Sequence, residues 1–465
     1  MEVATPATTV STAIRSARKR HLFSPPRVLA LSIAGFILAG TFLLWLPLSA
    51  APGRHTSLLD ALFTATSAVC VTGLIVQDTP IHFSTFGHVV ILILIQAGGL
   101  GYMTISTVLA AALGRSVTLQ ERLTLQEGLN VQGLDGLLRF ALTVLKFTLA
   151  FELGGAALLT LRWWSELGPG DAVWYGFFHA VSAFNNAGFA LWSDSLMRWR
   201  GDWAVNLVIT GLVIGGGLGF FVLTELLQRH RRARLSVHTR LVLASTVLLL
   251  VTATLAMYAL EVRNPATLGA LPEAERWLAA WFQAVTPRTA GFNTLDYGAM
   301  TPPALFLTMA LMFIGASPGS TGGGVKTTTF GITVAALWAT VRGDDEPHIF
   351  GRRLSAELVA RAFFVSLIAF LALNTVAGLV LVSEGRDLLR TLFETTSAFG
   401  TVGLSMGEGG APVSLTGFFS PTGKVLVMVM MFVGRLGPLT LAFAVARRAS
   451  VQPRLRYPEG KVLIG

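Results

Sequence analysis

Four glycines in this chain end short segments that share one pattern, and the backbone oxygens beside them are suited to holding a cation. The segments span residues 58–73, 172–188, 277–291 and 388–403, and their final glycines are 115, 103 and 112 residues apart. In three of them a phenylalanine stands ten residues before the glycine and four before a Ser-Ala pair, whereas the third segment is one residue shorter. The glycines are Gly73, Gly188, Gly291 and Gly403.

Each segment is too short to cross a bilayer, which takes about 20 apolar residues, and has the length of a re-entrant segment. Backbone that is not helical at membrane depth must be buried in protein or line a water-filled path. A ring of carbonyl oxygens can replace the hydration shell of potassium, and glycine tolerates the angles that aim carbonyls inward. A lone glycine would more simply indicate close helix packing. The repetition of the whole motif favours four pore loops.

The composition predicts an integral membrane protein, so these segments are expected to lie within a membrane. Of the 465 residues, 53% are hydrophobic and only 13% are charged, about half the usual charged share of roughly 25%. The single cysteine, Cys70, excludes an intrachain disulfide. We predict eight spans, two of which contain charged residues, at residues 28–53, 83–114, 140–161, 203–224, 241–260, 297–325, 362–383 and 425–446.

The net charge of +10 follows from topology rather than from nucleic-acid binding. With an even number of spans, 22 of the 35 lysines and arginines lie on the side of the termini and nine lie on the other side. Cytoplasmic loops carry the excess of positive charge. The sequence therefore predicts a multi-pass protein of the cell membrane with both termini in the cytoplasm.

An internal repeat organises the spans. The second helix of each unit carries a glycine-rich echo, at residues 97–101, 215–219, 315–319 and 433–437. We predict an all-α polytopic membrane protein of four helix–pore loop–helix repeats in pseudo-fourfold arrangement around a central pore. The predicted repeats are 28–114, 138–228, 238–341 and 357–446, with a cytoplasmic segment at 1–27 and a cytoplasmic tail at 447–465.

With these repeats and motifs the chain resembles the Trk/Ktr/HKT superfamily of potassium transporters. Its arrangement of eight predicted spans resembles the Ktr branch more than the Trk branch. The resemblance covers residues 28–446 and is carried by the motifs at 288–294 (RTAGFNT) and 315–328 (GASPGSTGGGVKTT). It implies potassium translocation through a filter of backbone carbonyls. The residues implied are Val71, Thr72, Gly73, Asn186, Ala187, Gly188, Thr289, Ala290, Gly291, Thr401, Val402 and Gly403. Glycine at all four filter places favours potassium over sodium, although departures such as Asn185-Asn186 leave the selectivity ratio open.

A loop within the span that begins at residue 297 is the expected gate. Residues 315–329 are rich in glycine, serine and threonine, and a proline removes a backbone donor while each glycine costs about 1 kcal/mol relative to alanine in a helix. The resemblance implies an intramembrane loop that obstructs the pore and moves on activation; a static kinked helix is the alternative. The gate residues are Gly315, Ser317, Pro318, Gly319, Gly322, Gly323, Gly324, Lys326 and Arg435.

Several charged residues admit two interpretations. Arg435 could repel cations or anchor the loop, or it could pair with a buried carboxylate, and Lys326 could face the pore or reach the cytoplasmic edge. We expect Lys146 to snorkel. Asp60 could raise the local cation concentration or cap the first pore helix, and capping is the expectation. The partner of Glu152 is open. The stretch Gly319–Thr327 does not match a phosphate-binding loop, because Val325 intervenes before the lysine and no strand precedes it.

Other classes of function fit less well. No His-Glu-x-x-His, Gly-x-Ser-x-Gly or aspartate pair occurs in the spans, so we predict that the chain is not an enzyme. An alternating-access carrier would show inverted repeats, whereas each repeat here keeps one orientation because it contains two spans. The resemblance implies no covalent cofactor, potassium as the transported ion, and room for sodium as an activator or coupled ion. It also implies a homodimer in membrane lipid and a separate cytosolic nucleotide-binding ring of the KtrA or TrkA kind.

Overall fold

The computed structural model describes residues 25–101, 137–228, 234–344 and 346–437. The predictions for the two terminal segments, and for the ends of the second and last spans, lie outside these residues. The described helices are α2 (Pro25–Trp45), α3 (Leu58–Val69), α4 (Thr79–His82), α5 (Thr85–Leu100), α8 (Leu137–Phe184), α9 (Trp203–Gly217), α10 (Phe220–Leu227), α11 (Val237–Glu261), α12 (Glu273–Val285), α13 (Pro302–Phe313), α14 (Thr327–Arg342), α15 (Ala356–Glu384), α16 (Leu388–Gly400) and α17 (Pro421–Leu436).

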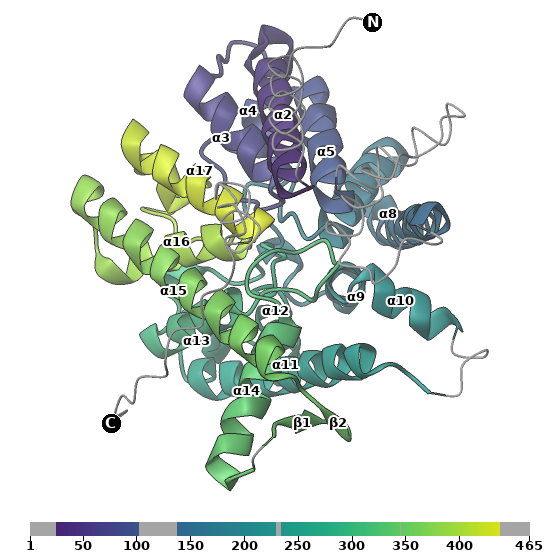
Figure 1. Ribbon diagram of the computed structural model, residues 1–465. Coiled ribbons are helices and arrows are strands. Elements are labelled where there is room, and N and C mark those ends of the chain that lie inside the picture. Colours follow the sequence, from purple (N-terminus) through teal and green to yellow (C-terminus); the bar gives the residue numbers. More distant parts are fainter. Residues whose placement is uncertain (1–24, 102–136, 229–233, 345, 438–465) are drawn as a thin grey trace, which may run out of the picture.

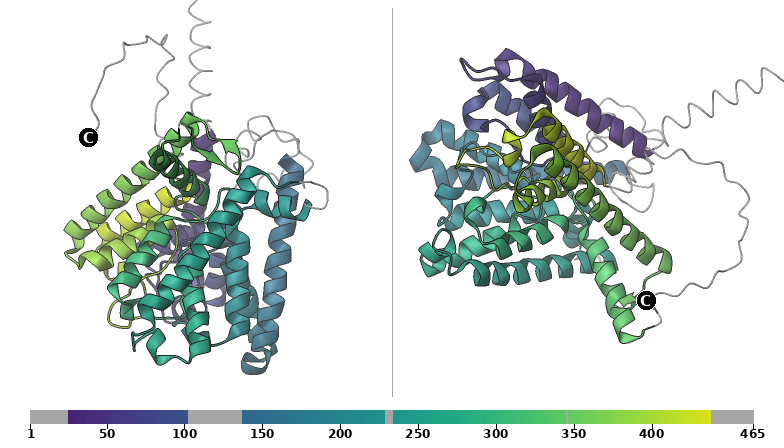
Figure 2. Two further views of the ribbon diagram at one scale, coloured as in Figure 1. Left: turned by 90° about the horizontal axis from the view of Figure 1, so that it is seen from below. Right: turned by 90° about the vertical axis from the view of Figure 1, so that its left-hand side faces the viewer.

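These helices form four groups in chain order around a centre filled by loops (Figure 1). α5 packs on α8, α9 on α12, α13 on α16, and α17 returns to α3, so the four groups close a ring. Figure 2 shows from two further sides that the long helices run side by side through one layer. A hairpin of β1 (His348–Ile349) and β2 (Arg352–Arg353) follows α14 at one end of this layer.

Helix boundaries follow local chemistry. Ser57, Ser84, Asp202 and Ser420 cap α3, α5, α9 and α17, each by accepting a hydrogen bond from a backbone N–H of the first turn. α8 contains a break at Gly168, whose φ of 75° is left-handed, and Pro169 begins the second part. Glycine tolerates that angle and proline suits a first helical turn. The second part of α8 therefore corresponds to the predicted short segment of the second repeat.

The lengths of the helices bear on the predicted spans. Within the described residues four helices are long and apolar enough to cross a membrane, or five if α9 and α10, bent by 99°, count as one. α5 and α13 are apolar but have only 16 and 12 residues. The mostly helical character is confirmed, whereas the count of eight spans stays a prediction.

Candidate filter and gating loop

The four predicted filter loops share one backbone conformation. Two residues before each glycine the chain takes a positive φ, at 56°, 58°, 74° and 51°, and each glycine does so again, at 89°, 70°, 78° and 94°. The first set consists of Val71, Asn186, Thr289 and Thr401. Side chains other than glycine rarely adopt this angle, and such strain gathers at functional sites. Its occurrence at four equivalent positions indicates that the loops are built alike.

A hydroxyl in each preceding helix ties down its own loop. Ser67 and Ser397 each accept a hydrogen bond from the N–H of their filter glycine at 3.0 Å. Ser182 donates to the carbonyl oxygen of Phe189 at 2.8 Å, and Thr286 donates to that of Phe292 at 2.5 Å. We did not predict these residues as part of the site. For the three serines the signal was the Ser-Ala pair of the repeat, which a serine in a membrane helix would equally explain, whereas Thr286 stands at the corresponding place before a proline.

The four loops meet around one point. A side-chain carbon added to Gly188 would lie 2.9 Å from the carbonyl oxygen of Ala290. In the same way Gly73 faces the carbonyl of Ala187, Gly291 that of Val402, and Gly403 that of Thr72. Each glycine thus abuts the carbonyl of the next loop in turn, and the last loop returns to the first. The structure brings all four predicted loops together.

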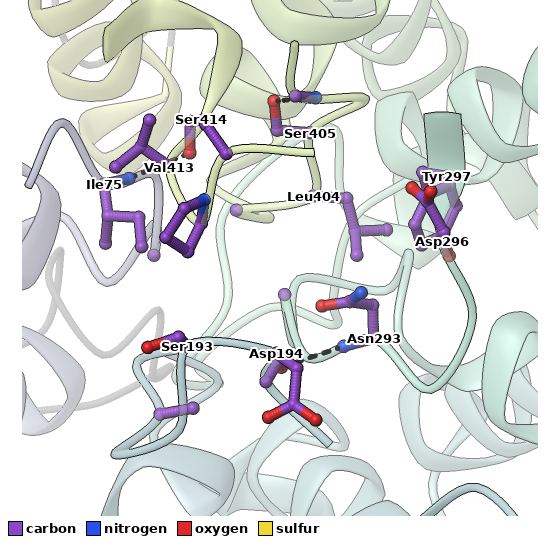
Figure 3. A pocket seen from close by; sticks show the side chains of 18 of the residues that line it. Ile75, Ser193, Asp194, Asn293, Asp296, Tyr297, Leu404, Ser405, Val413 and Ser414 are labelled. Atoms are coloured by element: carbon purple, nitrogen blue, oxygen red, sulfur yellow. Dashed lines mark hydrogen bonds between the residues drawn. The ribbon is translucent and has the colours of Figure 1, made fainter. Parts of the chain in front are cut away.

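A cavity of about 580 Å³ opens above this ring, and all four glycines line it. Figure 3 shows this cavity with its labelled side chains drawn from all four repeats. Hydrogen bonds join the loops around it: the N–H of Ile75 donates to Ser414 at 2.9 Å, and Ser193 donates to Asp78 at 2.6 Å. Burial raises the pKa of the Asp78 carboxyl, against the opposing effects of the Ser193 hydrogen bond and the positive charge of Arg54.

On the other side of the ring lies the predicted gating loop. The chain is not helical between α13 and α14, so a continuous kinked helix is not present. α14 begins at Thr327, so the last three residues of the predicted stretch are helical. The loop lies in the break between α9 and α10. Ser317 donates from its N–H to Gly217 at 3.1 Å, and Phe220 donates from its N–H to Gly319 at 2.9 Å. The glycine echo of the second repeat thereby frees backbone groups that hold the loop.

The loop also touches the filter. A side chain on Gly322 would meet Thr289, whose Cβ lies 3.1 Å from the added carbon. One on Gly323 would meet Thr401, at 2.9 Å from its Cγ2. The two glycines therefore allow the loop to approach the residues at which the filter backbone is left-handed.

Two basic side chains hold this loop through its carbonyl oxygens. Arg435 donates to Thr321 in the loop and to Gly98 in α5. Lys326 donates from Nζ to the carbonyl of Gly322 at 2.7 Å. The ion pairs formed among the described residues do not include Arg435, so this part of the chain gives it no carboxylate partner. Its contacts are those of an anchor, and those of Lys326 point to the loop rather than to the membrane edge.

The glycine echo has a packing role in three repeats. Gly98, Gly216 and Gly434 lie against the carbonyl oxygens of Val69, Phe184 and Phe399, which stand four residues before the filter glycines. No side chain fits at these places. The last glycine of each echo has a positive φ, between 65° and 94°, and α5, α9 and α17 end at or just before it.

The remaining charged residues have definite surroundings. Asp60 does not cap α3, because Ser57 does, and instead forms an ion pair with Lys424 at 2.9 Å that joins the first and last repeats. Lys146 is exposed, which agrees with the expected snorkelling. Glu152 is buried and accepts a hydrogen bond from Asn185 at 2.8 Å.

A mostly helical protein with long apolar helices and four loops that converge below one cavity has the architecture of a membrane transport protein. The family model TrkH, described as a cation transport protein, matches residues 29–452, and the chain belongs to this family.

Named relatives are similar over nearly the whole chain. The Ktr system potassium uptake protein B of Bacillus subtilis strain 168 is 42% identical, covering 95% of this chain and 97% of that protein. The protein of the same name from Vibrio alginolyticus is 40% identical over 95% of each. The potassium/sodium uptake protein NtpJ of Enterococcus hirae is 36% identical, covering 97% of this chain and all of that protein. The crystal structure of the potassium transporter TrkH from Vibrio parahaemolyticus matches with a TM-score of 0.71 over 90% of this chain and 83% of that chain, at 19% identity, which shows a shared fold.

Proposed function

We propose that this chain is the potassium-translocating membrane subunit of an uptake system. The observation that carries the proposal is the closed ring in which each filter glycine abuts the carbonyl oxygen of the next loop. Such oxygens take the place of the hydration water of a monovalent cation. The names of the Bacillus subtilis and Vibrio alginolyticus relatives supply the ion and the direction. The twelve predicted filter residues form the ion-binding site in this proposal.

The loop between α13 and α14 is the gate in this proposal. It lies against Thr289 and Thr401 and is held by Arg435 and Lys326. A cation leaving the filter toward this side would meet the loop, so the loop must move for conduction. The four repeats with their predicted boundaries, the eight spans and the cytoplasmic termini belong to the same proposal.

The proposed system has further components. The relatives' name, a Ktr system, implies more than one protein. We expect a homodimer with one pore in each protomer and a cytosolic nucleotide-binding ring that controls the gate. Sodium is an alternative or additional transported ion, because the Enterococcus hirae relative is named a potassium/sodium uptake protein. A sodium-coupled or less selective transporter is therefore the second candidate.

Rubidium-86 influx into proteoliposomes that contain this chain alone tests the proposal, with unlabelled potassium or sodium as competitor. Block by potassium and not by sodium is the expected result. Equal block would overturn the assignment of a potassium-selective filter and favour the second candidate. If no influx occurs, adding the regulatory ring with its nucleotide decides: continued absence of influx would overturn the proposal.

A further inference from the structure

A carboxyl group is buried behind the second filter loop, and the described residues give it no basic partner. Glu152 lies on α8 and its side chain is only 3% exposed. Its contacts are the neutral amides of Asn185 and Gln96, at 2.8 and 3.4 Å. The ion pairs seen in the described part of the chain do not include it. A charge buried in this way is costly unless it is paired.

The hydrogen bonds of this cluster do not balance. The Nδ2 atom of Asn185 carries two hydrogens, yet three oxygen atoms lie within 2.9 Å of it: Oε1 of Glu152, Oε1 of Gln96 and the carbonyl of Val181. The Oδ1 atom of Asn185 is itself buried and receives no hydrogen. The carbonyl of Val181 also accepts the backbone N–H of Asn185 at 3.1 Å, so the two Nδ2 hydrogens are enough for Glu152 and Gln96. The acceptor of this cluster left without a hydrogen is Oδ1 of Asn185, and one further hydrogen would satisfy it.

The cluster sits where it can govern the filter. Asn185 directly precedes Asn186, whose backbone is left-handed, and its side chain touches Gly99 of α5. Asn186 in turn contacts Thr289 of the third loop at 3.0 Å. A displacement of Asn185 would therefore shift two neighbouring filter loops.

Nearby charges do not replace the missing hydrogen. Arg435 is bonded to the carbonyl of Gly98 and lies 3.5 Å from that of Gly99. Lys326 donates its hydrogen bonds to the carbonyl oxygens of Gly322 and Gly323 in the gating loop. The thiol of Cys70, buried at the equivalent place in the first loop, is near Arg435. None of these three groups contacts Glu152 in the hydrogen bonds and ion pairs of the described residues, where its partners are Gln96 and Asn185.

We propose that Glu152 holds a proton, and that this neutral carboxyl positions Asn185 and thereby the second filter loop for cation selection. The O–H supplies the hydrogen that the amide cluster lacks. Glu152 is a positioning residue, since it reaches the ion path only through Asn185. The selectivity part of this inference rests on the proposed function, whereas the proton does not.

Glutamine is the sharp substitution, because it resembles a protonated carboxyl in shape and in having one donor and one acceptor end. We expect Glu152→Gln to keep the ratio of potassium to sodium block of rubidium influx within about twofold of wild type. Glu152→Ala should lower that ratio by about tenfold, since it leaves Asn185 unpaired. Loss of selectivity in the glutamine variant, with unchanged size-exclusion elution, would overturn the proposal.

Infrared difference spectroscopy tests the proton without relying on transport. Wild type minus Glu152→Gln should contain the C=O band of a protonated carboxylic acid, shifted in heavy water. Glu384→Gln is the matched control, because Glu384 receives hydrogens from the N–H and hydroxyl of Ser420 and should give carboxylate bands. Carboxylate bands from Glu152 would show that this residue is ionised and would overturn the proposal. If wild type shows no influx with or without the ring, the proposed function fails, while the spectrum still decides this inference.

Discussion

The filter glycine of the last repeat, Gly403, lies against the carbonyl oxygen of Thr72 in the first repeat, so loops 331 residues apart in sequence close one ring. The same relation links every neighbouring pair of loops. A side chain on any filter glycine would therefore strike an oxygen of the adjacent loop, and a change in one loop passes directly to the next.

Gly291→Ala should damage ion selection more than it damages folding. The new methyl group would strike the carbonyl of Val402, in addition to the cost of about 1–2 kcal/mol for a left-handed alanine. We expect the ratio of potassium to sodium block in rubidium influx to fall by about tenfold or more. Gly343→Ala is the control, because Gly343 has a similar φ of 75° with nothing within 4 Å of the added carbon. Equal effects of the two substitutions would contradict the role of the ring.

Removing the hydroxyls that tie the filter loops should loosen them. Ser67→Ala and Ser397→Ala each leave the N–H of a filter glycine without its acceptor, at a cost of about 1–3 kcal/mol. We expect a lower melting temperature and weaker discrimination against sodium. Ser32→Ala serves as the control, since the hydroxyl of Ser32 only donates to Leu29 within its own helix. A Ser67→Ala variant that matches this control in both measurements would speak against the tie.

Arg435→Gln should raise basal flux. The arginine joins the loop at Thr321 to α5 at Gly98, and glutamine has a shorter side chain and carries both of its donors on one nitrogen, so it cannot reach both carbonyls. We expect rubidium influx without the regulatory ring to increase several-fold, as should deletion of residues within the loop. Arg353→Gln, which changes an exposed pair with Glu346, should leave influx unchanged. Unchanged influx in the Arg435 variant would sink the gating assignment.

Asp78→Asn should stabilise the protein near neutral pH and not in acid. The folded state raises the pKa of Asp78, so ionisation of this carboxyl disfavours the fold as pH rises through the folded value. Asparagine removes that cost, while below the ordinary aspartate pKa of about 3.9 both side chains are neutral. Thermal melts of both forms across this pH range provide the measurement. A stabilisation that persists in acid would exclude the explanation by ionisation.

The sequence allowed the four filter loops to be located, because a motif repeated four times is visible without any structure. The positions of Gly73 and its three counterparts, and the loop after α13, follow from that repeat. Anchoring of the loop was one of the roles that the sequence left open for Arg435, and the sequence could not choose between them because the contact joins residues 114 positions apart in the chain. The prediction that Asp60 caps α3 was wrong for a local reason: Ser57 stands at the helix start, and Asp60 lies inside the first turn. The sequence did not show where helices end inside apolar stretches: α5 ends at Leu100, before Gly101, within the predicted second span, whose remaining residues lie outside the described part of the chain.

The position three residues before each filter glycine is occupied by four different residues: Cys70, Asn185, Arg288 and Gly400. Arg288 is buried, at 7% exposure. A channel assembled from four identical chains would have to place the same residue there four times, and four buried guanidinium groups around a cation filter would repel both one another and the ion. Because one polypeptide supplies all four quarters, a single arginine is tolerated there. Four loops within one polypeptide thus let each quarter of the proposed filter be changed independently by mutation, a freedom that a homotetramer lacks.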